Sequence, residues 1–96
     1  MEGQDSKMKF TDIEYDILNA LYFVEPFEKI VEEVNGSANI IADSLKQLID
    51  LRYVVAMRWD EDQNDFVRSF IYDADNMHAY HYLATKEGLM AHNSRD

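Results

Sequence analysis

Apolar positions recur at helical spacing in the middle of the chain and at two-residue spacing after it. The central stripe consists of Ile41, Leu45, Leu48 and Leu51, which share one helical face. Ser37 precedes the stripe and can cap a helix, because its hydroxyl accepts a hydrogen bond from an unpaired backbone N–H of the first turn. We therefore predict a helix that begins after Ser37 and leads directly into a strand at Val54.

Two further helices are predicted before this one. Thr11 and Glu14 have the spacing of a capping box, so a first helix is predicted over 12–23. A second is predicted over 26–34, because proline is tolerated in the first turn of a helix. Asn35 and Gly36 can then supply a left-handed stop. So tight a turn between the second and third helices is typical of a helix-turn-helix.

The second half of the chain reads as short strands followed by a helix. A polar turn, DEDQND at 60–65, predicts a hairpin. Thr85 can cap a short final helix that runs to about His92, which Gly88 weakens by about 1 kcal/mol relative to alanine. The predicted strands are 54–59, 66–72 and 78–83.

Two segments carry a family resemblance: LKQLIDLRYV at 45–54 and YHYLATKEG at 80–88. The first resembles a winged-helix recognition helix entering its first wing strand, and the second resembles the last wing strand and final helix. Over about residues 11–90 the chain is similar to small bacterial winged-helix regulators of the MarR and PadR type. The resemblance implies an α+β winged helix with a three-helix core, a small antiparallel sheet as the wing, and a short C-terminal helix. Those regulators usually have glycine where Arg52 stands, so we expect a different helix exit here.

Length and composition indicate one soluble domain. The 96 residues, 47% of them hydrophobic, fit a winged-helix domain at 11–93 after a flexible tail at 1–10. Nineteen acidic and nine basic side chains give a net charge of −10, which repels phosphate backbones and anionic lipids. The chain has no cysteine, no apolar run near the roughly 20 residues that span a bilayer, and no secretory signal at its start. We expect a cytoplasmic protein without membrane contact.

The resemblance makes a DNA-binding transcriptional regulator the first functional hypothesis. On the outward face of the third helix, Asn and Gln can read adenine, and Lys can contact guanine or phosphate. Two arginines flank the hairpin. Asp43 opposes this interpretation, and a plain solvated face is the alternative. The predicted DNA contacts are Asn39, Lys46, Gln47, Arg58 and Arg68.

The predicted hairpin tip supports a second hypothesis. DNA-binding wings usually carry Arg or Lys, whereas this tip carries Asp60, Glu61, Asp62 and Asp65. Such a tip favours an acidic winged-helix module that binds a protein and not DNA. The sheet aromatics are expected to pack within the core and across strands, and an exposed remainder would mark a homodimer surface.

No pattern indicates a metal site or an active site. The segment 60–65 has the alternate acidic spacing of a calcium loop but lacks its glycine and its final glutamate. Asp73, Asp75, His78 and His81 could suggest zinc, but a strand would point the two histidines to opposite faces. There is no glycine-rich phosphate loop and no nucleophile with a base. We expect no metal, no cofactor and no enzymatic activity.

Overall fold

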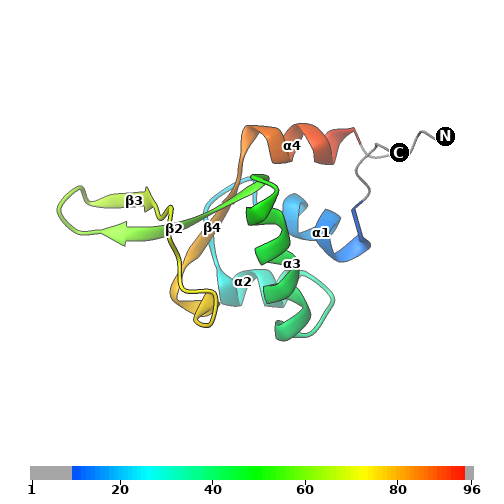
Figure 1. The fold of residues 1–96 in the computed structure, drawn as a ribbon, viewed down its shortest axis with the longest axis horizontal. Coiled ribbons are helices and arrows are strands. Elements are labelled where there is room, and N and C mark those ends of the chain that lie inside the picture. The colour runs from blue at the N-terminus through cyan, green and yellow to red at the C-terminus, as the bar shows by residue number, and fades with distance from the viewer. Residues whose placement is uncertain (1–9, 95–96) are drawn as a thin grey trace.

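The computed structural model describes residues 10–94, so the predicted tail, apart from Phe10, lies outside the described residues. In chain order the elements are α1 (Asp12–Ala20), β1 (Glu25–Pro26), α2 (Phe27–Glu33), α3 (Ala38–Asp50), β2 (Val54–Asp60), β3 (Asp65–Arg68), the 3-10 helix η1 (Met77–Ala79), β4 (His81–Ala84) and α4 (Lys86–Asn93). They form a mixed α+β fold whose antiparallel sheet has the strand order β1–β4–β2–β3. Figure 1 shows the β2–β3 hairpin extending away from the helices.

The first helix begins at the predicted capping box but ends earlier than predicted. The Thr11 hydroxyl accepts from the Glu14 N–H at 3.1 Å, and the Glu14 carboxylate accepts from the Thr11 N–H at 2.9 Å. Helical pattern continues to Phe23, yet α1 ends at Ala20 and Phe23 is 76% exposed. The chain leaves the helix because residues 25–26 pair with β4 as β1, a strand that the sequence pattern did not predict.

The turn between α2 and α3 is tight, as predicted, but is built differently. Pro26 is the N-cap of α2 rather than a residue of its first turn. The predicted left-handed stop at Asn35 and Gly36 is wrong, because Arg52 and Asn64 alone among the described residues have positive φ. Instead α2 ends at Glu33, and its C-cap residue Val34 is extended with φ −102° and ψ 131°. Figure 1 shows that α2 and α3 run in clearly different directions.

The predicted apolar stripe anchors α3 to the core. The Ser37 hydroxyl accepts from the Ile40 N–H at 3.2 Å, which confirms the predicted cap. The stripe residue that follows the helix, Leu51, is the C-cap and only half-buried. The stripe residues inside the helix are fully buried: Ile41, Leu45 and Leu48.

The exit from α3 has the conformation that glycine favours, although arginine occupies it. Arg52 has φ 66°, a left-handed conformation that glycine adopts without steric cost. Its N–H donates to the Ile49 carbonyl at 2.9 Å, and its carbonyl accepts from the Thr85 hydroxyl at 2.8 Å. Thr85 also caps α4, as predicted, by accepting from the Gly88 N–H at 2.9 Å. The end of α3 and the start of α4 therefore hold each other in place.

Gly88 is required by packing rather than being only a weak helix residue. A Cβ atom at this position would lie 2.1 Å from the Tyr53 carbonyl oxygen, well inside contact distance. The predicted penalty relative to alanine is therefore wrong in sign at this site, because alanine does not fit.

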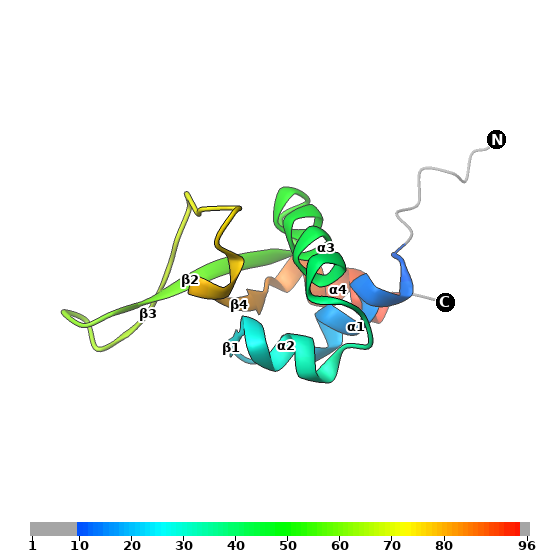
Figure 2. The same ribbon diagram turned by 90° about the horizontal axis from the view of Figure 1, so that it is seen from below.

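The β2–β3 hairpin is shorter on its return side than the sequence predicts. β2 closely matches its predicted range, but β3 ends at Arg68 rather than Tyr72. The Ser69 N–H still donates to the Ala56 carbonyl at 2.8 Å, after which the chain diverges. Figure 2 shows this connection arching to one side of the hairpin before it reaches η1.

The last predicted strand is divided in two. Its first part is η1, whose Met77 is buried in the core, and only His81–Ala84 forms a strand. Tyr82 is fully buried, and its hydroxyl donates to the Met77 carbonyl. Burial, reinforced by the neighbouring Tyr72 and Tyr80 hydroxyls, raises the pKa of Tyr82 above its usual value. This hydrogen bond ties the turn to the sheet.

Candidate interaction surfaces

The outward strip of α3 carries charges of both signs. Asn39 and Gln47, two of the predicted DNA contacts, are exposed on it. Lys46, the third, is half-buried, and its Nζ lies 3.7 Å from the Asp43 carboxylate. Asp50 adds a further exposed carboxylate at the end of the strip. The one lysine of α3 is therefore already paired, and the strip offers no net positive charge.

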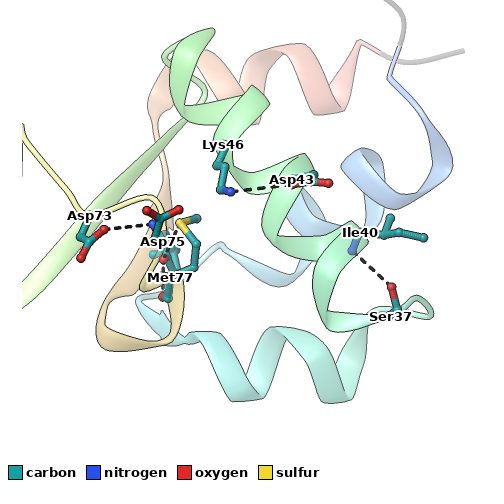
Figure 3. Close-up of polar contacts among 8 residues, drawn as sticks. Ser37, Ile40, Asp43, Lys46, Asp73, Asp75 and Met77 are labelled. Carbon is teal, nitrogen blue, oxygen red and sulfur yellow. Dashed lines mark hydrogen bonds and ion pairs between the residues drawn. The ribbon is translucent and has the colours of Figure 1, made fainter.

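A cleft of about 560 Å³ runs along this strip. Figure 3 shows Lys46 between α3 and the segment that carries Asp75 and Met77. An Asp lines each side, Asp43 on α3 and Asp75 opposite. A recognition helix enters the major groove as a projecting edge, whereas here a neighbouring segment walls one side of the helix. The lining residues are Phe27, Ala38, Asn39, Ala42, Asp43, Lys46, Ala74, Asp75, Met77 and His78.

The register of the hairpin separates the two arginines predicted to contact DNA. Arg58 lies opposite Val67, and Arg68 lies opposite Met57. Directly opposite residues of an antiparallel pair share a face, and neighbours along a strand alternate. Arg58 and Arg68 therefore project from opposite faces and do not form one basic patch. Arg68 is further engaged by the Phe70 ring, whose centroid lies 4.5 Å from its guanidinium carbon.

The four carboxylates at the hairpin end, which we call the acidic tip, have two different roles. The Asp60 carboxylate accepts from the Asp62 N–H at 2.9 Å and from the Gln63 side chain at 3.2 Å, so it shapes the turn. The Asp65 carboxylate accepts from the adjacent backbone N–H at 2.7 Å. Glu61 and Asp62 are exposed, and no described residue pairs with their side chains. These two are therefore the carboxylates available to a partner.

Three rings form a continuous aromatic row on the sheet: Trp59, Phe66 and His81. The ring centroids of Trp59 and Phe66 are 5.1 Å apart, and those of Phe66 and His81 are 4.5 Å apart. Pairing of Trp59 with Phe66 and of Met57 with His81 places all three on one face, which we call the outer face. Trp59 is 48% exposed. The sheet residues within the hydrophobic core come from the other face: Val54, Ala56, Tyr82 and Ala84.

Sequence reasoning anticipated the acidic tip but not the aromatic row. The expectation of core and cross-strand packing holds for Tyr82, and the rings of the row do pack across strands. They do so on the outer face, which the pattern could not reveal without the register. The alternation of Met57 and Trp59 with polar neighbours was the only available signal.

The histidines are not gathered into a site. His78 is exposed in η1 and His81 belongs to the aromatic row. Within residues 10–94, no group of three His, Asp or Glu side chains is placed to hold a metal ion. His92, near the predicted end of the final helix, is buried in α4 and stacks on Tyr15 with ring centroids 4.2 Å apart. Its Nε2 has no hydrogen-bond partner among the described residues.

Comparison with known proteins leaves the resemblance as a prediction from sequence. No family model, no curated protein and no solved structure matches the chain. Among the described residues, no helix has the length and apolar character needed to cross a membrane.

Proposed function

We propose that this chain is a winged-helix module that binds a protein partner through its β2–β3 hairpin and does not bind duplex DNA. One observation carries the proposal: both surfaces that would meet a duplex are acidic or neutral. At the tip, Glu61 and Asp62 have no partner among the described residues, and on the strip of α3 the one lysine pairs with Asp43.

The winged-helix assignment is supported by the order and pairing of the elements. Three helices precede the hairpin, the turn between α2 and α3 is short, and β4 returns beside β2 before the last helix. β1, which lies between α1 and α2 in the chain, pairs with β4 at the edge of the sheet. In this proposal the β2–β3 hairpin is the wing.

Electrostatics favours a protein over a nucleic acid. DNA affinity comes largely from Lys and Arg that neutralise phosphates and release counterions. Two like unit charges about 4 Å apart instead repel by about 1 kcal/mol in water. With the arginines on opposite faces, neither face of the hairpin offers more than one of them to a phosphate backbone. The negative field of this protein attracts a partner with basic side chains and repels a phosphate backbone.

DNA binding remains the second candidate, favoured by the exposed amides of Asn39 and Gln47 on α3. If it occurs, its salt dependence is unusual. Salt screens the repulsion between acidic protein and phosphates, since the Debye length falls from about 10 Å at 0.1 M to about 3 Å at 1 M. An acidic protein that reads bases would therefore gain affinity as salt rises, opposite to an ordinary DNA binder.

The decisive measurement is fluorescence anisotropy with a random duplex pool across the whole range of salt. We expect no saturable binding at any concentration of salt. Binding that strengthens with salt and is lost in Asn39→Ala and Gln47→Ala would establish the DNA-reading alternative and overturn the proposal.

A second experiment tests the protein partner with a matched control. Full-length protein is used to capture partners from cells, with Glu61→Lys and Asp62→Lys combined in one variant. The control carries Glu28→Lys and Glu32→Lys on the exposed side of α2, which changes net charge equally. We expect the captured partner to be lost from the hairpin variant and kept by the control. Equal loss from both variants would mean that only overall charge matters.

A further inference from the structure

We infer that the partner presents arginine side chains, one stacked on the aromatic row and others paired with Glu61 and Asp62. This inference rests on the proposed function and specifies the chemistry of its partner. It follows from two features that the hairpin brings side by side, a half-exposed aromatic row and two unpaired carboxylates.

The aromatic row includes one half-exposed ring, that of Trp59, which a planar cation can reach. Trp59 is 48% exposed and lies on the face opposite the sheet residues of the main hydrophobic cluster. Indole is the best ring for cation–π contact, and arginine is the side chain that most often makes it. The molecule already uses the same contact nearby, where the Arg68 guanidinium lies 4.5 Å from the Phe70 ring centroid.

The acidic tip adds a second requirement that the same residue type meets. Glu61 follows Trp59 by two residues, so the free carboxylates lie in the turn directly after the strand that carries the exposed indole. A guanidinium can bind a carboxylate with two parallel hydrogen bonds and can also stack on a ring, whereas an ammonium group does neither as well. A segment with several arginines therefore fits the tip and the row together.

Arg68 makes the two ends of this surface electrostatically different. It lies on the same outer face as Trp59 and Phe66 but farther from the tip. A cation placed beside it would be repelled, so the basic residues of the partner are confined to the tip end of the hairpin. Other occupants fit less well, because a second copy would bring its own acidic tip, and nucleic acid or anionic lipid would bring phosphates.

Trp59 reports on its own surface, because it is the one tryptophan of the chain. The probes are three synthetic peptides of identical length in which the same positions carry arginine, lysine or glutamate. We expect saturable change in Trp59 emission with the arginine peptide, weaker binding of the lysine peptide, and no change with the glutamate peptide. Equal affinity for all three, or no binding of the arginine peptide, overturns the inference.

Variants show whether the free carboxylates take part. Glu61→Gln with Asp62→Asn leaves the turn-forming Asp60 intact. This double variant should lower the affinity for the arginine peptide by about two- to tenfold, as expected for the loss of exposed ion pairs. The control, Glu28→Gln with Glu32→Gln on α2, changes net charge equally and should bind like the original protein. Circular dichroism confirms that both variants are folded. Equal affinity of the two variants contradicts the assigned role of the tip.

Two further outcomes identify where the reasoning failed. Hairpin-dependent capture of a cellular partner without any response to the arginine peptide removes this inference and leaves the proposed function standing. A rise in solution mass with concentration, accompanied by a blue shift of Trp59 emission, identifies a second copy as the occupant and overturns the inference.

Discussion

Replacing Arg52 by glycine should make the protein more stable, although it removes a charged side chain. Arg52 is exposed and has φ 66°, a left-handed conformation that a side chain disfavours. The hydrogen bonds that fix this conformation come from its own N–H to Ile49 and from the Thr85 hydroxyl to its carbonyl. Both are backbone interactions of residue 52, so Arg52→Gly retains them.

The size of the effect is a difference between two terms. A left-handed conformation costs an L-residue about 1–2 kcal/mol, which glycine does not incur. Glycine in turn gives the unfolded chain more freedom, which costs about 0.4–1 kcal/mol. The net gain should therefore be about 0.8 kcal/mol. For a chain of this size it corresponds to a rise in Tm of about 3–6 °C.

Urea unfolding followed by circular dichroism measures this gain, and Arg52→Ala is the matched control. Alanine also removes the charge and the long side chain but keeps the Cβ that causes the strain. We therefore expect Arg52→Ala to stay within about 0.5 kcal/mol of the original protein. The reasoning is refuted if Arg52→Gly is destabilised, or if alanine stabilises as much as glycine, because the gain would then come from removing the side chain.

Three further predictions use the same unfolding assay. Gly88→Ala should cost about 3 kcal/mol or fail to fold, because its Cβ would overlap the rigid Tyr53 carbonyl; a loss below about 1 kcal/mol would contradict this packing. Leu48→Ala should cost about 2–5 kcal/mol, whereas Gln47→Ala on the exposed side of α3 should change stability by less than about 0.5 kcal/mol. Burial raises the pKa of Tyr82, so the unfolded chain loses this proton near its ordinary pKa of 10.0 while the folded chain keeps it. The contribution of Tyr82 to the free energy of unfolding should be fully present below pH 10.0 and should decrease above it. In Tyr82→Phe, the free energy of unfolding should decrease less steeply with pH in this alkaline range.

The helices could be predicted because their signals are local. Thr11, Ser37 and Thr85 each act within three residues of themselves, so the sequence alone predicts all three caps. Burial of the α3 stripe follows from its spacing for the same reason. Where α1 ends could not be predicted, because the pairing of residues 25–26 with β4 depends on residues more than fifty positions away.

The sheet was less predictable because pairing partners and register are not local. The apolar run after β3 has the composition of a strand, yet Phe70 and Ile71 are 79% and 90% exposed, and within residues 10–94 no strand pairs with them. After β3 the chain can continue as a strand or turn back toward η1. We attribute the turn to the burial of Met77 and Tyr82 in the core. Propensity favours a strand at 78–80, but burial of Met77 and the bond from the Tyr82 hydroxyl favour a turn.

Only part of the candidate site could be predicted from the sequence. The four carboxylates lie within six residues of sequence, 60–65, so the acidic tip follows from reading the chain. Two properties needed coordinates: the division between turn-forming Asp60 and unpaired Glu61, and the meeting of His81 with Phe66 across β2. The register also places Arg58 and Arg68 on opposite faces of the hairpin. They therefore do not form the single basic patch that their positions on either side of the turn in the sequence allow.

The acidity of this protein can serve solubility or recognition. The two explanations differ in whether the positions of the carboxylates matter. Solubility depends on net charge, so any two exposed carboxylates are equivalent. Recognition depends on where the charge lies, so Glu61 and Asp62 in the hairpin turn differ from Glu28 and Glu32 on α2. The acidic tip favours recognition, because the Asp60 carboxylate is used by the turn, whereas those of Glu61 and Asp62 have no partner among the described residues and follow the strand that carries an exposed indole. Neutralising each pair in turn separates the explanations, since solubility predicts equal effects and recognition predicts an effect at the hairpin alone.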